Sequence, residues 1–218
     1  MYRVKEAFYT LQGEGAQAGR AAVFCRFSKC NLWTGREKDR ATAVCDFCDT
    51  DFVGTDGQNG GVFTTPEALA AHIAGLWPVA PGKPYVVCTG GEPLLQLDSP
   101  LINALHQAGF EIGVETNGTL PAPAGIDWLC VSPKADAPVV IERCSELKLV
   151  YPQPKAMPER FLHIQAEHFF LSPMASPSAP ETSTDVIKQS NTRKATDYCL
   201  ANPRWRLTLQ MHKIIGID

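Results

Sequence analysis

Short apolar runs alternate along the chain with amphipathic segments, and this pattern predicts the order of secondary structure. Runs rich in β-branched and aromatic residues predict buried strands. Amphipathic segments bounded by capping residues, proline or glycine predict helices. The predicted strands are residues 21–27, 85–89, 111–116, 127–132, 146–150, 168–172 and 205–210, and the predicted helices are residues 66–76, 100–108 and 184–201. Strands that alternate with helices indicate a parallel α/β sheet, open or closed.

The length, composition and net charge of the chain limit the classes of protein to which it can belong. With 218 residues, of which 44% are hydrophobic and 20% charged, the chain has the size and balance of one globular domain, residues 1–218. A net charge of −3 argues against nucleic acid as a main partner. We recognise neither an export signal nor an apolar run long enough to cross a bilayer, so we expect no membrane association and a cytoplasmic location.

Three of the eight cysteines lie in one loop, residues 28–50: Cys30, Cys45 and Cys48. Thiolate is a soft metal ligand, and a Cys-x-x-Cys pair can direct both sulfurs at one centre. Three cysteines without an adjacent fourth suggest an iron–sulfur cluster with one open coordination position. From the spacing alone, a zinc site completed by a distant ligand fits as well. The remaining cysteines are predicted to be core thiols: Cys25, Cys88, Cys130, Cys144 and Cys199.

Two segments outside the predicted strands and helices are interpreted as surface. Residues 36–40 (REKDR), inside the cysteine loop, carry both signs of charge and predict a solvated face. Residues 51–64 are rich in glycine, aspartate and asparagine, which predicts an irregular connection.

Two predicted strands place a charged residue on an inward face. In the first predicted strand, alternation puts Arg26 opposite Cys25, so that Arg26 requires an anion, either a substrate or a structural partner. In the third, Glu115 shares a face with Gly113, whose missing side chain leaves room for a ligand. Alternatively, Glu115 forms a purely structural ion pair with Lys134 or Arg26.

Polar and glycine residues follow the ends of five predicted strands. They are the cysteine loop, residues 89–92 (TGGE), 115–117 (ETN), 132–134 (SPK) and 172–173 (SP). The carboxyl ends of parallel strands meet at one edge of the sheet, where α/β folds bind ligands. Any one of these segments would also make a good turn, but five at one edge predict a common binding site.

One combination of motifs connects the chain to a known superfamily. Gly90-Gly91-Glu92-Pro93 follows a predicted strand downstream of the clustered cysteines, and Phe47 directly precedes Cys48. In this respect the chain resembles the radical S-adenosylmethionine superfamily, in which three cysteines bind a [4Fe-4S] cluster whose fourth iron takes the amino and carboxylate groups of S-adenosylmethionine. The usual spacing there is Cys-x-x-x-Cys-x-x-Cys, whereas fourteen residues separate Cys30 from Cys45 here, as if a segment were inserted into the motif.

Further motifs, in order along nearly the whole chain, resemble the 7-carboxy-7-deazaguanine synthase family, some members of which have an enlarged cluster loop. They are Gln12-Gly13-Glu14-Gly15, Arg26, Cys48-Asp49-Thr50, residues 89–96 (TGGEPLLQ), Glu115-Thr116-Asn117-Gly118, Ser132-Pro133-Lys134 and Gln210-Met211-His212-Lys213. The resemblance implies a lyase reaction in which 6-carboxy-5,6,7,8-tetrahydropterin contracts to 7-carboxy-7-deazaguanine with loss of ammonia, on the route to queuosine and other deazapurines. It also implies a [4Fe-4S] cluster that cleaves S-adenosylmethionine to a 5′-deoxyadenosyl radical, with Mg²⁺ assisting.

The resemblance implies roles for individual residues. Cys30, Cys45 and Cys48 are the catalytic cluster ligands, and Thr50 is the protein ligand of Mg²⁺. The implied substrate contacts are Leu11, Gln12, Gly13, Glu14, Arg26, Thr89, Glu115 and Asp218. The implied contacts of S-adenosylmethionine are Phe47, Cys48, Asp49, Gly91, Ser132, Pro133, Lys134, Ser172, Pro173, Met174 and Ala175.

The predicted fold is an incomplete, partly TIM-like α/β barrel of about six parallel strands with few covering helices. By resemblance we expect a homodimer and an electron donor of the flavodoxin or ferredoxin kind. Two other functions remain possible at this level: an activase that makes a glycyl radical on a partner protein, and a non-catalytic zinc or iron–sulfur binding module.

Overall fold

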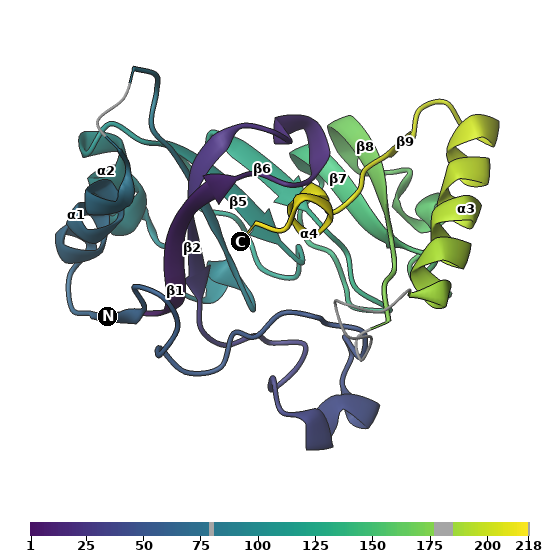
Figure 1. Ribbon diagram of the computed structural model, residues 1–218, viewed down its shortest axis with the longest axis horizontal. Helices are drawn as coiled ribbons and strands as arrows, with labels where there is room; N and C mark the ends of the chain where they lie inside the picture. The colour runs from purple at the N-terminus through teal and green to yellow at the C-terminus, as the bar shows by residue number, and fades with distance from the viewer. Residues whose placement is uncertain (79–80, 177–184, 218) are drawn as a thin grey trace.

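The computed structural model describes residues 1–78, 81–176 and 185–217. Its strands form one sheet in the order β3-β1-β2-β4-β5-β6-β7-β8-β9 (Figure 1). The strands are β1 (Tyr2–Leu11), β2 (Ala21–Phe27), β3 (Gly61–Phe63), β4 (Tyr85–Gly90), β5 (Glu111–Thr116), β6 (Trp128–Val131), β7 (Arg143–Tyr151), β8 (Gln165–Pro173) and β9 (Arg206–Leu207).

Strand directions confirm the predicted fold class. Strands β2, β4, β5, β6, β7, β8 and β9 pair in parallel, and only β1 runs antiparallel to its neighbours β2 and β3. The sheet ends at β3 on one side and β9 on the other, so the barrel is incomplete. The predicted last strand is shorter than expected, because only Arg206–Leu207 pairs with β8. The prediction of a single domain stays a prediction.

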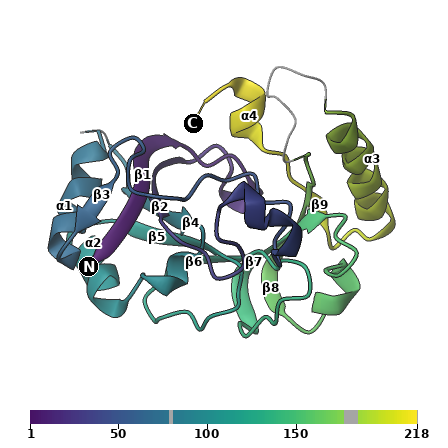
Figure 2. The ribbon, with the colours of Figure 1, turned by 90° about the horizontal axis from the view of Figure 1, so that it is seen from below.

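Few helices cover the sheet. They are α1 (Pro66–Leu76), α2 (Ser99–Gln107), α3 (Val186–Ala201) and the short α4 (Met211–Ile215). Both views place α1 and α2 at one end of the sheet and α3 at the other (Figures 1 and 2). The first two predicted helices are confirmed, and each begins at a side-chain cap, Thr65 for α1 and Asp98 for α2. The predicted start of the third, at residue 184, lies outside the described residues.

Alternation along β7 separates the two faces of the sheet. Leu147 and Leu149 are fully buried in the apolar core that α3 covers. Glu146 and Lys148 have the opposite parity and lie on the inner face, which α1, α2 and α3 do not cover. Along β7 the inner face is therefore polar and the outer face apolar, whereas Ala22, Tyr85 and Val87 form a separate apolar cluster on the inner side of β2 and β4.

Strands β1 and β3 and helix α4 were not predicted from the sequence. Strand β1 contains Lys5 among apolar residues. The ammonium of Lys5 is buried and lies 2.9 Å from the carboxylates of both Asp51 and Asp56. Both aspartates belong to residues 51–64, predicted as an irregular connection, which in fact contributes β3 at the sheet edge. The prediction was wrong there because β3 is a three-residue strand with little apolar signal.

No helix among the residues that the structure describes is long and apolar enough to cross a membrane.

Candidate active site

A cavity of about 1240 Å³ opens on the inner face of the sheet and reaches the cysteine loop. It brings together residues that lie far apart in the sequence. The predicted site residues that line it are Leu11, Gln12, Gly13, Glu14, Arg26, Cys30, Cys45, Phe47, Cys48, Asp49, Thr50, Thr89, Gly91, Glu115, Ser132, Lys134, Ser172, Pro173, Met174 and Ala175. Pro133 does not line it; it is buried, and its carbonyl accepts a hydrogen bond from Gln153. Asp218 lies outside the described residues.

The three loop cysteines are free thiols that share this cavity. A hydrogen bond from the Cys45 thiol lowers the pKa of Cys48 to about 6. The same contact, together with burial, raises the pKa of Cys45 well above its usual value. Burial raises the pKa of Cys30. Cys48 is therefore the thiol that ionises most readily, and Cys30 and Cys45 must lose their protons when metal binds.

The three loop thiols suit an iron–sulfur cluster, in which each cysteine binds a different iron. Within the described ranges, no three His, Cys, Asp or Glu side chains enclose a position for a single metal ion, as a structural zinc site requires. In addition, Trp33 lines the cavity, and its buried Nε1 has no acceptor among the described residues. Sulfur atoms of a cluster would offer acceptors on that wall.

Cys25 lies on the opposite face of β2 from Arg26, in the apolar core, which confirms that it is not placed with the loop cysteines. Cys88, Cys130 and Cys144 are also buried free thiols, as predicted, and Cys199 is half-buried.

Close backbone contact positions Cys30 beside the glycine motif. The Glu92 N–H donates to the Lys29 carbonyl at 2.9 Å, and a Cβ on Gly91 would lie 2.1 Å from that carbonyl oxygen and 2.9 Å from Cys30 Cβ. Only glycine fits at position 91 for this reason. Its predicted contact with S-adenosylmethionine stays a prediction.

Glu92 anchors the ends of two strands and is fully buried. Its carboxylate accepts hydrogen bonds from the Thr116 hydroxyl at 2.7 Å and the Asn117 N–H at 2.8 Å, at the end of β5, and from the Leu94 N–H at 2.9 Å. Burial raises its pKa. The motif residues 115–117 therefore owe their position partly to Glu92.

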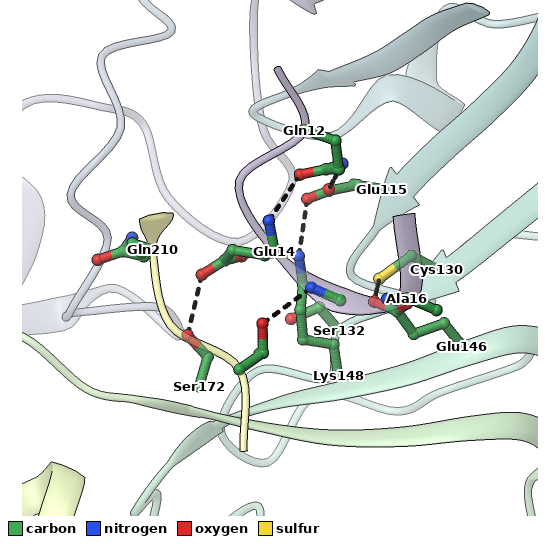
Figure 3. Close-up of polar contacts among 12 residues, drawn as sticks. Gln12, Glu14, Ala16, Glu115, Cys130, Ser132, Glu146, Lys148, Ser172 and Gln210 are labelled. Atoms are coloured by element: carbon green, nitrogen blue, oxygen red, sulfur yellow. Dashed lines mark hydrogen bonds and ion pairs between the residues drawn. The ribbon is translucent and has the colours of Figure 1, made fainter. Parts of the chain in front are cut away.

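A buried ionic network crosses the inner face (Figure 3). The Lys148 ammonium donates to Glu14 at 2.7 Å and to Glu115 at 3.2 Å. Burial alone would lower the pKa of Lys148, but the charges of Glu115 and Glu14 outweigh it and raise that pKa well above its usual value. Gln12 donates to Glu115 at 2.9 Å, and Ser172 donates to Glu14 at 3.0 Å. The network links the segment after β1 to β5, β7 and β8.

Lys148 was not predicted as a site residue. Residues 146–150 (ELKLV) alternate charged and apolar positions, which for a buried parallel strand indicates a charged interior face. That signal could have identified both Lys148 and Glu146. The Glu146 carboxylate accepts from the Ala16 N–H at 2.7 Å and contacts the Cys130 thiol at 3.4 Å (Figure 3).

Two expectations about the inner face of β5 were wrong. The partner of Glu115 is Lys148, not Lys134 or Arg26. The space beside Gly113 is filled by the Tyr85 side chain, whose hydroxyl would lie 2.2 Å from a Cβ at that position. Tyr85 is fully buried, so Gly113 makes room for a tyrosine of the neighbouring strand and not for a ligand.

Arg26 has the predicted inward orientation. Its Nε donates to Glu6 at 2.7 Å, so the structural ion pair exists. Its Nη groups donate no hydrogen bond within the described part of the chain, and the residue lines the cavity beside Thr89, its register partner on β4. The guanidinium therefore has donors left for an anion in the cavity.

The C-terminal segment closes one side of the cavity. Lys213 donates to Asp49 at 2.6 Å and Gln210 does so at 3.4 Å. Burial acts to raise the pKa of Asp49, but the charge of Lys213 outweighs it and lowers that pKa. A Cβ on Gly13 would lie 2.1 Å from Nδ1 of His212, so this segment also packs tightly against the end of β1. Figure 1 shows α4 lying across the middle of the sheet.

Lys134 turns back on its own segment. Its ammonium donates to the Ser132 carbonyl at 2.7 Å and the Ser132 hydroxyl at 2.6 Å, at the end of β6. Both residues line the cavity near the cysteines, and the Lys134 charge acts to lower the pKa of Cys48.

Residues 36–40 are not wholly a solvated face. Arg36, Glu37 and Lys38 are exposed, as predicted. Arg40 instead turns inward and contacts the backbone of the cysteine turn, which its sequence context did not indicate.

Known proteins are similar to this chain over nearly its whole length. No protein-family model matches it. A 7-carboxy-7-deazaguanine synthase of Caulobacter vibrioides is 62% identical over 216 residues, with 99% of each chain covered. One from Bordetella pertussis is also 62% identical, and one from Burkholderia multivorans 57%, with the same coverage. The chain belongs to the 7-carboxy-7-deazaguanine synthase family. The family prediction and the enzyme class that goes with it are thus confirmed.

A solved structure agrees with this family assignment. The crystal structure of QueE from Escherichia coli superposes with a TM-score of 0.69 at 25% identity, covering 97% of this chain and 94% of that chain. The solved structure and the curated relatives therefore indicate the same family and the same fold. A glycyl-radical activase or a non-catalytic binding module has no support from these comparisons.

Proposed function

We propose that this chain converts 6-carboxy-5,6,7,8-tetrahydropterin to 7-carboxy-7-deazaguanine with loss of ammonia, as a radical S-adenosylmethionine lyase. The observation that carries the proposal is one cavity lined both by Cys30, Cys45 and Cys48 and by the network of Lys148, Glu14 and Glu115. The three thiols suit a metal cofactor, and the fixed set of charges suits a polar substrate.

Cys30, Cys45 and Cys48 would hold the [4Fe-4S] cluster. When bound and reduced, the cluster would supply the electron that cleaves S-adenosylmethionine. This cleavage would provide the 5′-deoxyadenosyl radical for hydrogen abstraction. The chain's own residues would position the cofactor: Ser132 and Lys134 offer a hydroxyl and an ammonium to carboxylate or ribose. Phe47, Asp49, Gly91 and residues 172–175 line the same part of the cavity and complete the proposed contacts.

The substrate would lie between Arg26 and Glu115. The Nη groups of Arg26, which have no hydrogen-bond partner among the described residues, suit the pterin carboxylate, for which a planar fork gives two parallel hydrogen bonds. Glu115, held by Gln12 and Lys148, offers carboxylate oxygens to the guanidine-like edge of the pterin. Leu11, Gln12, Gly13, Glu14 and Thr89 line the remainder of this wall, and we place Asp218 with them only by resemblance.

Thr50 is the proposed protein ligand of Mg²⁺. It follows Asp49 in the cavity wall, and Asp49 itself is engaged by Lys213. A hydroxyl oxygen suits this hard ion, which keeps water and substrate oxygens as its other ligands. We further propose a flavodoxin- or ferredoxin-like electron donor, a homodimer and a cytoplasmic location.

Anaerobic reconstitution with iron and sulfide tests the proposed cofactor. We expect the unaltered protein to gain iron–sulfur absorbance and to cleave S-adenosylmethionine when reduced. Cys48→Ser should lose both properties, whereas Cys199→Ser, in α3 and outside the cavity, should keep both. A protein that binds zinc, forms no cluster and leaves S-adenosylmethionine intact would contradict the proposal.

A further inference from the structure

The fourteen residues between Cys30 and Cys45 form a compact loop closed at its base. The Leu32 carbonyl accepts from the Val44 N–H at 3.1 Å and the Cys45 N–H at 3.4 Å. A short 3₁₀ helix, Glu37–Thr42, lies within the loop. Figure 1 shows this segment projecting below the sheet, away from the covering helices. Besides the cysteine turn, the insertion contacts the segment after β5, through Asn31 with Asn117 and Thr119, and Phe52, through Trp33.

One side chain of this insertion binds the turn that carries Cys45 and Cys48. Nη1 of Arg40 donates to the Asp46 carbonyl at 2.8 Å and to the Cys48 carbonyl at 3.0 Å. Its Nε donates to Glu37 at 2.8 Å, so the guanidinium is held from its own helix as well. Although the insertion is at the surface, the Arg40 side chain is only 20% exposed.

The Arg40 guanidinium also stacks on the ring of Trp33. Its central carbon lies 4.3 Å from the centre of the Trp33 ring, and Trp33 packs edge-on against Phe52 at 5.7 Å. Trp33 is buried and lies close in sequence to Cys30. Arg40 thus contacts residues near all three cysteines: Trp33 on the Cys30 side and two carbonyls of the Cys45–Cys48 turn.

We propose that Arg40 is a positioning residue for the cluster, acting through the backbone of the Cys45–Cys48 turn. A long loop between two ligands has more conformations to lose than a short one when the ligands converge. A planar guanidinium can hold two carbonyls while stacking on an indole, which a lysine ammonium cannot do. Arg40 thereby compensates for the lengthened spacing between Cys30 and Cys45. This inference rests on the proposed function.

Three variants test it: Arg40→Met, Arg40→Lys and the control Arg36→Met. Arg36 lies in the same insertion and is exposed, and its side chain makes no hydrogen bond or ion pair among the described residues. Each protein is reconstituted anaerobically without substrate. We measure the rate of cluster loss to an iron chelator, the electron paramagnetic resonance spectrum with and without S-adenosylmethionine, and the melting temperature of the apoprotein.

Arg40→Met should lose its cluster about tenfold faster than the unaltered protein, as expected for charge-assisted hydrogen bonds. Its spectrum with S-adenosylmethionine should broaden, while the melting temperature stays within a few degrees. Arg40→Lys should resemble Arg40→Met, and Arg36→Met should match the unaltered protein. Equal cluster retention in Arg40→Met, or full rescue by Arg40→Lys, would overturn the inference and leave the proposed function standing. Failure of the unaltered protein to form a cluster would overturn both.

Discussion

Lys148 and Glu14 are 134 residues apart in sequence and form an ion pair of 2.7 Å in which the two side chains are 5% and 15% exposed, respectively. The pair ties the segment after β1 to the inner face of β7, across the open interior of the sheet. A buried pair of this kind rarely adds stability over an apolar pair of the same shape. Its value here is that it presents charged groups in fixed positions to the cavity.

Removing Lys148 should be strongly destabilising. In Lys148→Met the carboxylates of Glu14 and Glu115 lose their shared cation, and such a loss typically costs about 3–5 kcal/mol of unfolding free energy. Urea denaturation of the apoprotein measures it. The control is Lys155→Met, whose exposed pair with Asp136 should contribute no more than about 1 kcal/mol. Equal losses in the two variants would show that the buried network has no special role.

Glu14 should make stability depend on acid pH. Burial acts to raise its pKa, but the charge of Lys148 outweighs burial and lowers that pKa below its unfolded value of about 4.3. A lowered folded-state pKa gives stability that is present above the unfolded pKa and is lost as the pH falls toward the folded pKa.

The measurement is the unfolding free energy between about pH 6 and about pH 3, where the Glu14 contribution should disappear. The unaltered protein should lose more stability over this range than Glu14→Gln does. Glu92 and Glu146, whose pKa values burial raises, contribute with the opposite sign in both proteins and cancel in the comparison. Parallel pH profiles of the two proteins would contradict the argument.

Arg26 should determine substrate binding without affecting cofactor cleavage. Arg26→Gln removes the proposed fork for the pterin carboxylate, and charge-assisted hydrogen bonds of this kind correspond to about a tenfold to hundredfold loss in kcat/KM. Cleavage of S-adenosylmethionine without substrate should continue at the unaltered rate. Arg20→Gln, which breaks an ion pair with Glu111 outside the cavity, serves as control and should retain kcat/KM. An Arg26→Gln protein that retains kcat/KM would exclude the proposed orientation of the substrate.

Gly91→Ala should displace the backbone that carries Cys30. The added Cβ would lie 2.1 Å from the Lys29 carbonyl oxygen, which cannot move without moving Cys30. We expect lower iron content after reconstitution. Gly75→Ala is the matched control, because a Cβ there has nothing within 4 Å in the described structure and glycine is unfavourable in a helix. A Gly91→Ala protein with full iron content would indicate that the loop tolerates the shift.

The sequence predicted the position of every parallel strand, because each contains an apolar run, but it gave β7 and β8 too short and β9 too long. It did not predict β1, since Lys5 and Glu6 interrupt the apolar pattern there and their partners, Asp51, Asp56 and Arg26, are remote in sequence. It also did not predict β3, whose strand character comes from pairing with β1.

In the candidate active site, too, some features were predicted from the sequence and others were not. Motif residues such as Arg26 and Glu115 were placed correctly on the inner face, because strand alternation alone decides their direction. The partners of these residues could not be predicted, since Lys148 meets Glu115 only through the curvature of the sheet. Likewise, the contact of Arg40 with the cysteine turn depends on the path of a loop, for which alternation gives no rule.

The most direct test of the central claim is product formation by the reconstituted protein. The assay contains 6-carboxy-5,6,7,8-tetrahydropterin, S-adenosylmethionine, Mg²⁺ and a reductant under anaerobic conditions, and mass spectrometry follows the product. We predict 7-carboxy-7-deazaguanine, formed with release of ammonia and absent when Cys48→Ser replaces the unaltered protein. Cleavage of S-adenosylmethionine with no conversion of the pterin would contradict the proposed function.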